Sequence, residues 1–309
     1  MIVEVTKDIY RKYFKDNPHS FISERFIELN RNKVDGVLRL VSDKRMPVIG
    51  FIAGVKGTSI HSPFSAPFGG FHYQKENVYI SEIEEYIREL KSYLIRNNYS
   101  DINLVLPPDI YQTNFNSKVA NVLLREEFKI TSPDITCWVD LEDFELGFKA
   151  KNVRKYLRQA IANGLSFSKV SDKEDCEAVY EIVKANRRRL ERPIYMSFKD
   201  LLDIAELWPV DFFKVTSKDL KIVSSAIFYR NHPKICFGVF WGDTESGRLL
   251  RAMDFLAYNL WGYYKNEGYK YLDLGISTES GKPNEGLLRF KESHLAHSSL
   301  RLQFCWKSH

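Results

Sequence analysis

Residues 272–293 decide the fold, and they read LDLGISTESGKPNEGLLRFKES. The apolar residues at the start of this stretch predict a strand over residues 271–276. Turn-forming residues then predict a loop, and the run that ends in Phe290 and Lys291 follows it. Because α/β sheets bind ligands at the carboxyl ends of their strands, we expect any chemistry to centre on residues 273–291.

The same order of elements is predicted in both halves of the chain. The second half has a hairpin, a helix and a strand at residues 222–229 with 234–241, 249–267 and 271–276. The first half has them at residues 34–40 with 47–55, 80–97 and 102–106, and a loop rich in Pro and Gly lies at residues 61–71. Asn98 and Gly268 end the two helices, and Tyr99 and Tyr269 follow them at the same offset. This constant offset indicates a duplicated unit.

A basic helix is predicted between the halves, at residues 149–164. Its apolar residues Val153, Leu157 and Ile161 recur at helical spacing, and Gly164 suits the residue after a helix. We place the boundary near residues 144–147, which gives domains at residues 1–145 and 146–309.

Composition sets broad limits on the class of protein. The chain has 309 residues, of which 44% are hydrophobic and 28% charged, which is typical of a globular protein with two cores. The sequence has no apolar run long enough for a membrane span and no secretion signal at its N-terminus, so we expect a cytoplasmic protein. The four cysteines and seven histidines lack metal-ligand spacing, and a net charge of +5 permits an anionic ligand without requiring a nucleic acid.

Two features of the second half carry a resemblance to a known family. The first is the motif formed by Asp273, Gly275, Asn284, Gly286, Leu287, Phe290 and Lys291. The second is the basic helix RKYLRQAIANGL at residues 154–165. Both resemble FemAB-like (FemABX) proteins of the GNAT superfamily, the acyl-CoA N-acyltransferases. The resemblance implies an α/β (α+β) fold with two tandem GNAT-like domains, each a mixed, mostly antiparallel sheet flanked by helices.

The resemblance also implies an activity. FemAB-like proteins suggest an N-acyltransferase that moves an acyl or aminoacyl group to an amine of a cell-envelope or sugar precursor, by direct attack and without a covalent enzyme intermediate. The loop at residues 242–254 departs from the pyrophosphate loop of acetyltransferases, since only Gly247 and Arg248 match it. Acetyl-CoA, longer acyl-CoA and aminoacyl-tRNA therefore stay open as donors, and we expect no tightly bound cofactor, no metal and no DNA partner.

Candidate catalytic residues follow from the motif. Lys291 is expected to stabilise the oxyanion near the donor, and Asp273 to orient or deprotonate the amine. Each has a structural alternative, because lysines are common on helix surfaces and strand-end aspartates often bond nearby backbone N–H groups. The residues expected to bind the donor are Gly247, Arg248, Phe290 and Ser277.

Candidate acceptor-binding residues lie in two other segments. The loop that contains Ser65, Phe68, Gly69 and Gly70 would let backbone approach a ligand, although Gly-Gly loops are often simple turns. Arg154 and Arg158, with the Arg run at residues 187–189, would meet the phosphates of an acceptor, coenzyme or tRNA end, although charge runs are usually solvated.

Two other classes of function stay in view. A catalytically silent protein would keep the fold and bind a sugar or peptide ligand, and the departure in the loop at residues 242–254 favours it. An RNA-binding module would use the basic helix with exposed aromatic residues, and its RNA affinity would fall steeply with salt.

Overall fold

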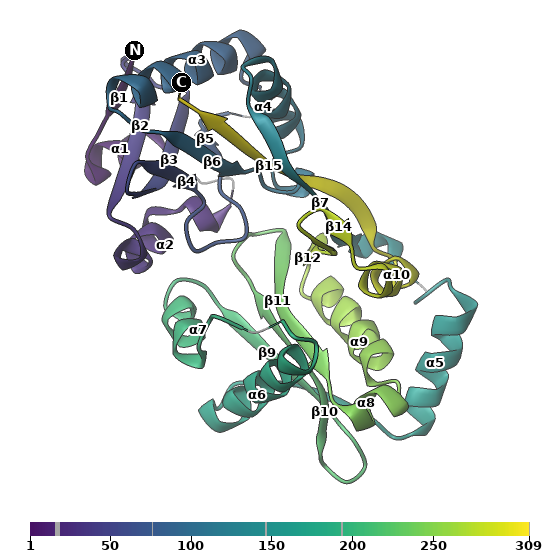
Figure 1. The fold of residues 1–309 in the computed structure, drawn as a ribbon. Coiled ribbons are helices and arrows are strands. Elements are labelled where there is room, and N and C mark those ends of the chain that lie inside the picture. The colour runs from purple at the N-terminus through teal and green to yellow at the C-terminus, as the bar shows by residue number, and fades with distance from the viewer. Residues whose placement is uncertain (16–18, 76, 146, 193, 309) are drawn as a thin grey trace. The chain divides into compact units, whose positions relative to one another are not determined.

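A computed structural model describes residues 1–15, 19–75, 77–145, 147–192 and 194–308 (Figure 1). The chain divides into two compact units. Unit 1 consists of Met1–Ile135, Thr278–Lys282 and Ser299–His309, and unit 2 of Thr136–Ser277 and Pro283–Ser298. The expected boundary at residues 145/146 stays a prediction about the domains, and residue 146 lies outside the described residues. In the division into compact units, the chain first passes from unit 1 to unit 2 within a strand, ten residues before that boundary.

Unit 1 contains a sheet whose strands follow one another in the order β1-β2-β3-β4-β6, with β5 also paired to β3. The strands of unit 1, inside and outside this sheet, are β1 (Ile2–Glu4), β2 (Gly36–Ser42), β3 (Ile49–Lys56), β4 (Ser59–Ser62), β5 (Phe71–Tyr73), β6 (Asp101–Val105) and β13 (Thr278–Glu279). Its helices are α1 (Lys7–Tyr13), η1 (Ser20–Ile22), α2 (Glu24–Leu29), η2 (Arg31–Lys33), α3 (Ile80–Arg96), η3 (Asp109–Tyr111) and α4 (Thr113–Arg125).

Unit 2 contains strands in the order β12-β11-β10-β9-β8. They are β8 (Ser166–Val170), β9 (Val210–Thr216), β10 (Ile222–Tyr229), β11 (Ile235–Asp243) and β12 (Tyr271–Ile276). The helices are η4 (Leu141–Asp143), α5 (Lys151–Ala162), α6 (Lys173–Arg189), α7 (Phe198–Ala205), α8 (Glu245–Leu249), α9 (Ala252–Asn266) and α10 (Glu285–Ser293). Three strands have residues in both units: β7 (Lys129–Asp140), β14 (Lys282–Pro283) and β15 (His297–Lys307).

The duplicated unit is confirmed, with a correction to how its parts correspond. Both predicted hairpins form, as the antiparallel pairs β2/β3 and β10/β11. In each unit, however, three antiparallel pairings are followed by one parallel pairing, β4/β6 in unit 1 and β11/β12 in unit 2. The counterpart of β10/β11 is therefore β3/β4 and not β2/β3. The short strand β4 was missed because four residues carry too little periodic pattern.

Each unit completes its sheet with a strand from the other half of the sequence. In unit 1, β6 pairs antiparallel with the last residues of β15, Gln303 to Lys307. Phe304 and Trp306 from this segment belong to the apolar core of unit 1. In unit 2, β12 pairs antiparallel with the end of β7, where Asp273 is opposite Trp138. Neither sheet is complete without residues that are remote in sequence.

Helices cover both faces of the unit 2 sheet. Successive residues of a strand point to opposite faces. On β10, the Ser224 hydroxyl donates to the carbonyl of Ala252 in α9, and the Ser225 hydroxyl donates to the carbonyl of Val179 in α6. Helices α9 and α6 therefore lie on opposite sides of β10 (Figure 1).

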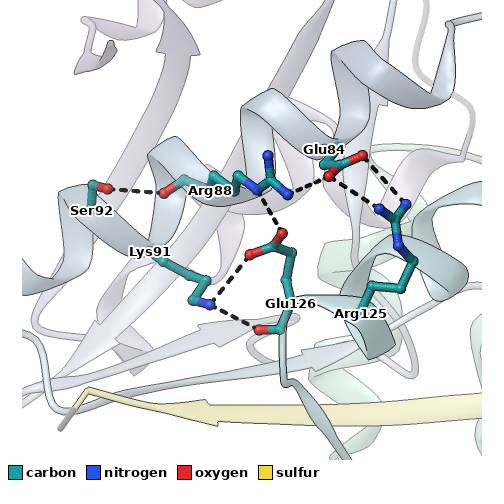
Figure 2. Close-up of polar contacts among 6 residues, drawn as sticks. All are labelled: Glu84, Arg88, Lys91, Ser92, Arg125 and Glu126. Atoms are coloured by element: carbon teal, nitrogen blue, oxygen red, sulfur yellow. Dashed lines mark hydrogen bonds and ion pairs between the residues drawn. The ribbon is translucent and has the colours of Figure 1, made fainter.

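In unit 1, helix α3 buries the apolar face that its sequence predicts: Ile83, Ile87, Leu90 and Leu94. An ion-pair network joins the outer side of α3 to the end of α4 (Figure 2). Arg88 pairs with Glu84 and, at 2.7 Å, with Glu126, while Arg125 reaches Glu84 at 3.2 Å. Lys91 adds a hydrogen bond to the Glu126 carbonyl at 3.0 Å. Because the arginines are half exposed, we expect the network to orient the two helices more than to stabilise them.

Among the described residues, every helix is too short or too polar to cross a membrane. The thiols of Cys137, Cys176 and Cys236 are buried and reduced, and that of Cys305 is partly exposed and reduced.

We expect acid to destabilise unit 1 through His72, which is buried in β5. Its Nδ1 shares a hydrogen bond with the Tyr10 hydroxyl at 2.7 Å, and burial, with a smaller effect of the His19 charge, lowers the pKa of His72 to about 3. His72 in the unfolded chain therefore binds a proton near pH 6.5, whereas His72 in the folded unit stays neutral until a much lower pH. Stability should fall by about 1.4 kcal/mol per pH unit between roughly pH 6 and pH 4.

Hydrogen exchange of the β3 and β5 peptides at several pH values measures this effect. The His72→Gln variant keeps a side chain that can bond Tyr10 but removes the imidazole. The pH dependence of its exchange protection should therefore be weaker, by the uptake of one proton. An unchanged slope would rule out His72 as its source.

The strand exchange predicts that the two halves of the sequence do not fold alone. Residues 1–145 lack Phe304, whose side chain is 1% exposed, and residues 146–309 lack the strand that pairs with β12. We expect poorly dispersed amide spectra from either piece, and a dispersed spectrum when residues 299–309 are joined to residues 1–145 by a flexible linker. A folded 1–145 fragment without that addition would contradict the interpretation.

Candidate functional site

A cavity of about 480 Å³ lies in unit 2 beside the end of β11 and the start of α9. Strands β11 and β12 pair only from Ile235–Phe237 to Tyr271–Asp273, and beyond that point their backbones diverge. The residues that line the cavity come from α6 and the segment after it, the end of β11, the α8–α9 corner and α10. They are Asn186, Arg187, Arg189, Leu190, Arg192, Trp241, Gly242, Asp243, Arg248, Arg251, Ala252, Met253, Asp254, Asn284, Leu287 and Phe290.

Positive charge dominates this cavity, because five of the lining residues are arginines. Arg189 lies 3.4 Å from Asp243, and the charge of Arg248 also acts on that carboxylate. Burial nevertheless raises the pKa of Asp243. Arg187 has no hydrogen bond or ion pair to its side chain among the described residues, and its Nε is buried. Burial, with the neighbouring charge of Arg192, lowers the pKa of Arg187, so an anion placed here would relieve a real electrostatic cost.

The corner between α8 and α9 adds a helix N-terminus to the cavity. Arg251 precedes α9 with a left-handed backbone (φ 61°), and its guanidinium lies 4.0 Å from the ring centre of Tyr156. Ala252, Met253 and Asp254 form the first turn of α9 and line the cavity. The N–H groups and partial positive charge of a helix start favour an anion.

Two of the residues expected to bind the donor meet in this cavity, Arg248 and Phe290. The other two lie outside its lining. Gly247 is buried in α8, where its N–H donates to the Thr244 hydroxyl at 3.0 Å, and an added Cβ would lie 2.0 Å from the Val223 carbonyl oxygen. Ser277 is buried with its hydroxyl 3.2 Å from the Cys137 sulfur. Their donor-binding role stays a prediction.

Lys291 is buried, with a side chain that is 1% exposed and that does not line the cavity. Its Nζ donates to the carbonyl oxygens of Leu274 at 2.8 Å, Gly275 at 2.9 Å and Ile276 at 3.1 Å. These are the β12 residues beyond the last pair with β11. Lys291 therefore donates hydrogen bonds to three carbonyls of β12 that lie beyond its pairing with β11.

Asp273 is also buried, at the point where β12 leaves β11. Its Oδ1 accepts a hydrogen bond from the Gly275 N–H at 2.8 Å, and Gly275 has a φ of 67°. This is the local turn bond that the structural alternative anticipates. The catalytic roles expected for Asp273 and Lys291 stay predictions, since neither side chain reaches the cavity lining.

The expected acceptor residues fall into both units. Ser65 is exposed and accepts a hydrogen bond from Lys33, whereas Phe68, Gly69 and Gly70 are buried in unit 1. Arg154 and Arg158 are exposed on α5 in unit 2, and Arg154 lines a second cavity beside Glu142, Asp143 and Glu145. The acceptor role of all six residues stays a prediction.

Sequence reasoning missed two residues, Asp254 and His294. Asp254 lines the cavity from α9, and its Oδ1 lies 3.2 Å from Nε2 of His294, which follows α10. In the sequence, Asp254 is one acidic residue within a predicted helix and His294 has no ligand spacing, so no local pattern relates the two.

The comparisons with known proteins fit the paired units. No protein-family model matches the sequence, and no curated protein matches it. The crystal structure of FemX superimposes with a TM-score of 0.70 at 12% identity, over 100% of this chain and 97% of FemX. A tandem GNAT protein from the clavulanic acid biosynthesis pathway gives 0.60 at 8% identity, over 99% of this chain and 98% of that one. This chain has a tandem GNAT fold.

A further structure extends the comparison of the GNAT fold. The C-terminal domain of a putative lysylphosphatidylglycerol synthetase from Agrobacterium fabrum gives a TM-score of 0.60 at 13% identity, over 98% of this chain and 93% of that one. The predicted fold and its resemblance to FemAB-like proteins are thus confirmed.

We predict that Lys291→Met destabilises unit 2. The substitution preserves much of the volume but removes the donor to three buried carbonyls, which should cost about 2–4 kcal/mol. Urea unfolding monitored by tryptophan fluorescence measures the change. Lys282→Met, at an exposed lysine, is the matched control and should change stability little. Unchanged stability of Lys291→Met would show that the hydrogen bonds of Lys291 are dispensable for folding.

Proposed function

We propose that this chain is an N-acyltransferase that uses a phosphate-bearing donor, acyl-CoA or aminoacyl-tRNA, and transfers the acyl or aminoacyl group to an amine. The observation that carries the proposal is the cavity of unit 2, which places five arginines around the N-terminus of α9. Guanidinium groups match phosphate oxygens in geometry and charge, and a helix start adds N–H donors.

The chemistry of the lining favours direct transfer. None of the described lining residues carries a hydroxyl, thiol or amine nucleophile. An acyl-enzyme held as an ester, thioester or amide would need such a group beside an activating base. The simplest reaction is therefore attack of the acceptor amine on the donor carbonyl, with the donor held by its phosphates and by the apolar surfaces of Trp241, Leu287 and Phe290.

We assign Lys291 and Asp273 indirect roles in this function. Lys291 holds the carbonyl groups at the end of β12, and Asp273 holds the turn at Gly275. Together they fix the backbone at the end of β12 against α10, which contributes Phe290 to the cavity lining. We further propose a cell-envelope or sugar precursor as the acceptor class, a choice supported by one neighbour's name, lysylphosphatidylglycerol synthetase, and by the likeness to FemX.

Calorimetric titration with acetyl-CoA and, separately, with bulk aminoacyl-tRNA tests the donor site. Each charge-assisted hydrogen bond that is lost should cost about 1.5–3 kcal/mol, so we expect Arg187→Gln and Arg248→Gln each to weaken binding at least about tenfold. Arg188→Gln is the matched control, because Arg188 is exposed on the same helix as Arg187 but does not line the cavity.

Two results would contradict the proposal. One is absence of binding by either donor to the unmodified protein, which would favour the catalytically silent binding protein. The other is an equal loss of affinity in Arg188→Gln, which would indicate nonspecific attraction to the basic end of α6.

A further inference from the structure

Three large apolar side chains are exposed at one end of unit 2. Leu220 is 84% exposed in the turn between β9 and β10, Leu249 is 81% exposed at the end of α8, and Ile161 is 56% exposed on α5. Single exposed apolar residues are common on protein surfaces, whereas several that lie together mark a binding surface.

Contacts between their neighbours bring these three segments together. The side chain of Lys218, in the β9–β10 turn, lies against Gly164 after α5, where an added Cβ would come within 2.3 Å of Lys218 Cε. The side-chain amide of Asn163 donates to the carbonyl of Leu250, which follows α8, at 3.5 Å. Helix α8 also packs on β10 (Figure 1). Residues 158–164, 217–221 and 245–251 therefore form one surface, which we call the Leu220 surface.

Leu220 occupies a position that disfavours leucine in two ways. Its backbone is left-handed, with a φ of 60°, a conformation that suits Gly or Asn better than a larger side chain. The turn is closed by backbone alone, because the Leu220 N–H donates to the Ser217 carbonyl and the Ser217 N–H to the Lys221 carbonyl, both at 2.9 Å. Neither the backbone nor packing within the described residues favours a leucine here, whereas an apolar partner outside the chain would.

Cations outnumber carboxylates around these apolar side chains. The charged residues of the Leu220 surface are all exposed, and they are Arg158, Lys218, Asp219, Lys221, Glu245, Arg248 and Arg251. Five cations against two carboxylates favour an anionic partner. Arg248 and Arg251 also line the cavity of unit 2, so a partner bound here would lie next to that cavity.

We propose that the Leu220 surface binds the surface of an anionic lipid bilayer. Aliphatic side chains enter the boundary between headgroups and acyl chains, and surrounding Lys and Arg residues attract anionic headgroups. Membrane binding of this kind needs no spanning helix and does not depend on the proposed acyl transfer.

Other partners match only part of the Leu220 surface. A single-stranded nucleic acid would fit the charge, but it binds by stacking on aromatic rings, and the three exposed apolar side chains are aliphatic. A second copy of this chain would cover the apolar side chains, but a symmetric contact would bring the cations of both copies together. An anionic bilayer matches the apolar and the charged residues at once.

Vesicle co-sedimentation tests the apolar part of the proposal. We expect the protein to bind vesicles of phosphatidylglycerol and phosphatidylcholine in equal parts. Burial of one leucine changes affinity by about tenfold, so Leu220→Asn and Leu249→Gln should each weaken binding by about that factor. Leu124→Gln is the matched control, because Leu124 is 50% exposed on α4 of unit 1, and its binding should be unchanged.

The charged part is tested with the same vesicles. Binding should weaken with added salt and be much weaker to vesicles of phosphatidylcholine alone. Each basic residue near an anionic bilayer contributes about fivefold in affinity, so Lys221→Gln should lose about that factor. Lys129→Gln, at an exposed lysine of unit 1, is the control for charge. Because Asn suits a left-handed backbone, thermal unfolding of Leu220→Asn should occur at or above the unmodified temperature, which separates lost binding from lost folding.

Four results would overturn the proposal. The first is no binding of the unmodified protein to the anionic vesicles, and the second is full binding by both leucine variants. The third is self-association in analytical ultracentrifugation that Leu220→Asn abolishes, which would assign the surface to a second copy of the chain. The fourth is binding of single-stranded RNA, in place of vesicles, that depends on Leu220 and Leu249.

Discussion

The exchange of β7 and β15 between the two halves of the sequence is the constraint on which the other features depend. The end of β7 pairs with β12 of unit 2, and the end of β15 pairs with β6 of unit 1. Because each central parallel pair receives its next strand from the opposite half, neither β6 nor β12 is left as an open edge. Each half of the sequence therefore needs a strand from the other half. The residues after α10 supply the strand that completes the sheet of unit 1.

The burial of Lys291 follows from the end of the parallel ladder in unit 2. Once β11 and β12 diverge, the carbonyls of Leu274 to Ile276 need donors other than β11, and Lys291 provides them from α10. The end of β11 contributes Trp241 and Asp243 to the cavity, and α10 contributes Phe290. The end of the β11/β12 ladder therefore explains the buried lysine and the docking of α10 on β12. Buried lysines need such full hydrogen bonding to be tolerated.

Sequence predicted those features that depend on local pattern. The hairpins, α3, α9 and β12 follow from apolar periodicity, and the motif with the basic helix carried the resemblance that implied the GNAT fold. Arg248 and Phe290, both expected to bind the donor, line one cavity. The sequence did not predict the exchanged strands or the carbonyl partners of Lys291, because these contacts join residues that no local pattern relates. Asp254 was hidden for a similar reason: in sequence it is one acidic residue at the start of a helix, and only the fold brings His294 to it.

The two units close the end of the equivalent strand in different ways. By the constant offset that relates Ile102 to Leu272, Val105 corresponds to Gly275. In unit 1 the Val105 carbonyl accepts from the Gly69 N–H at 2.9 Å, and the aromatic side chain of Phe68 is buried beside it. In unit 2 the Gly275 carbonyl accepts from Lys291 instead. The loop of unit 1 thus closes its own strand end with backbone and an aromatic ring. Unit 2 closes the same strand end with one long side chain from α10.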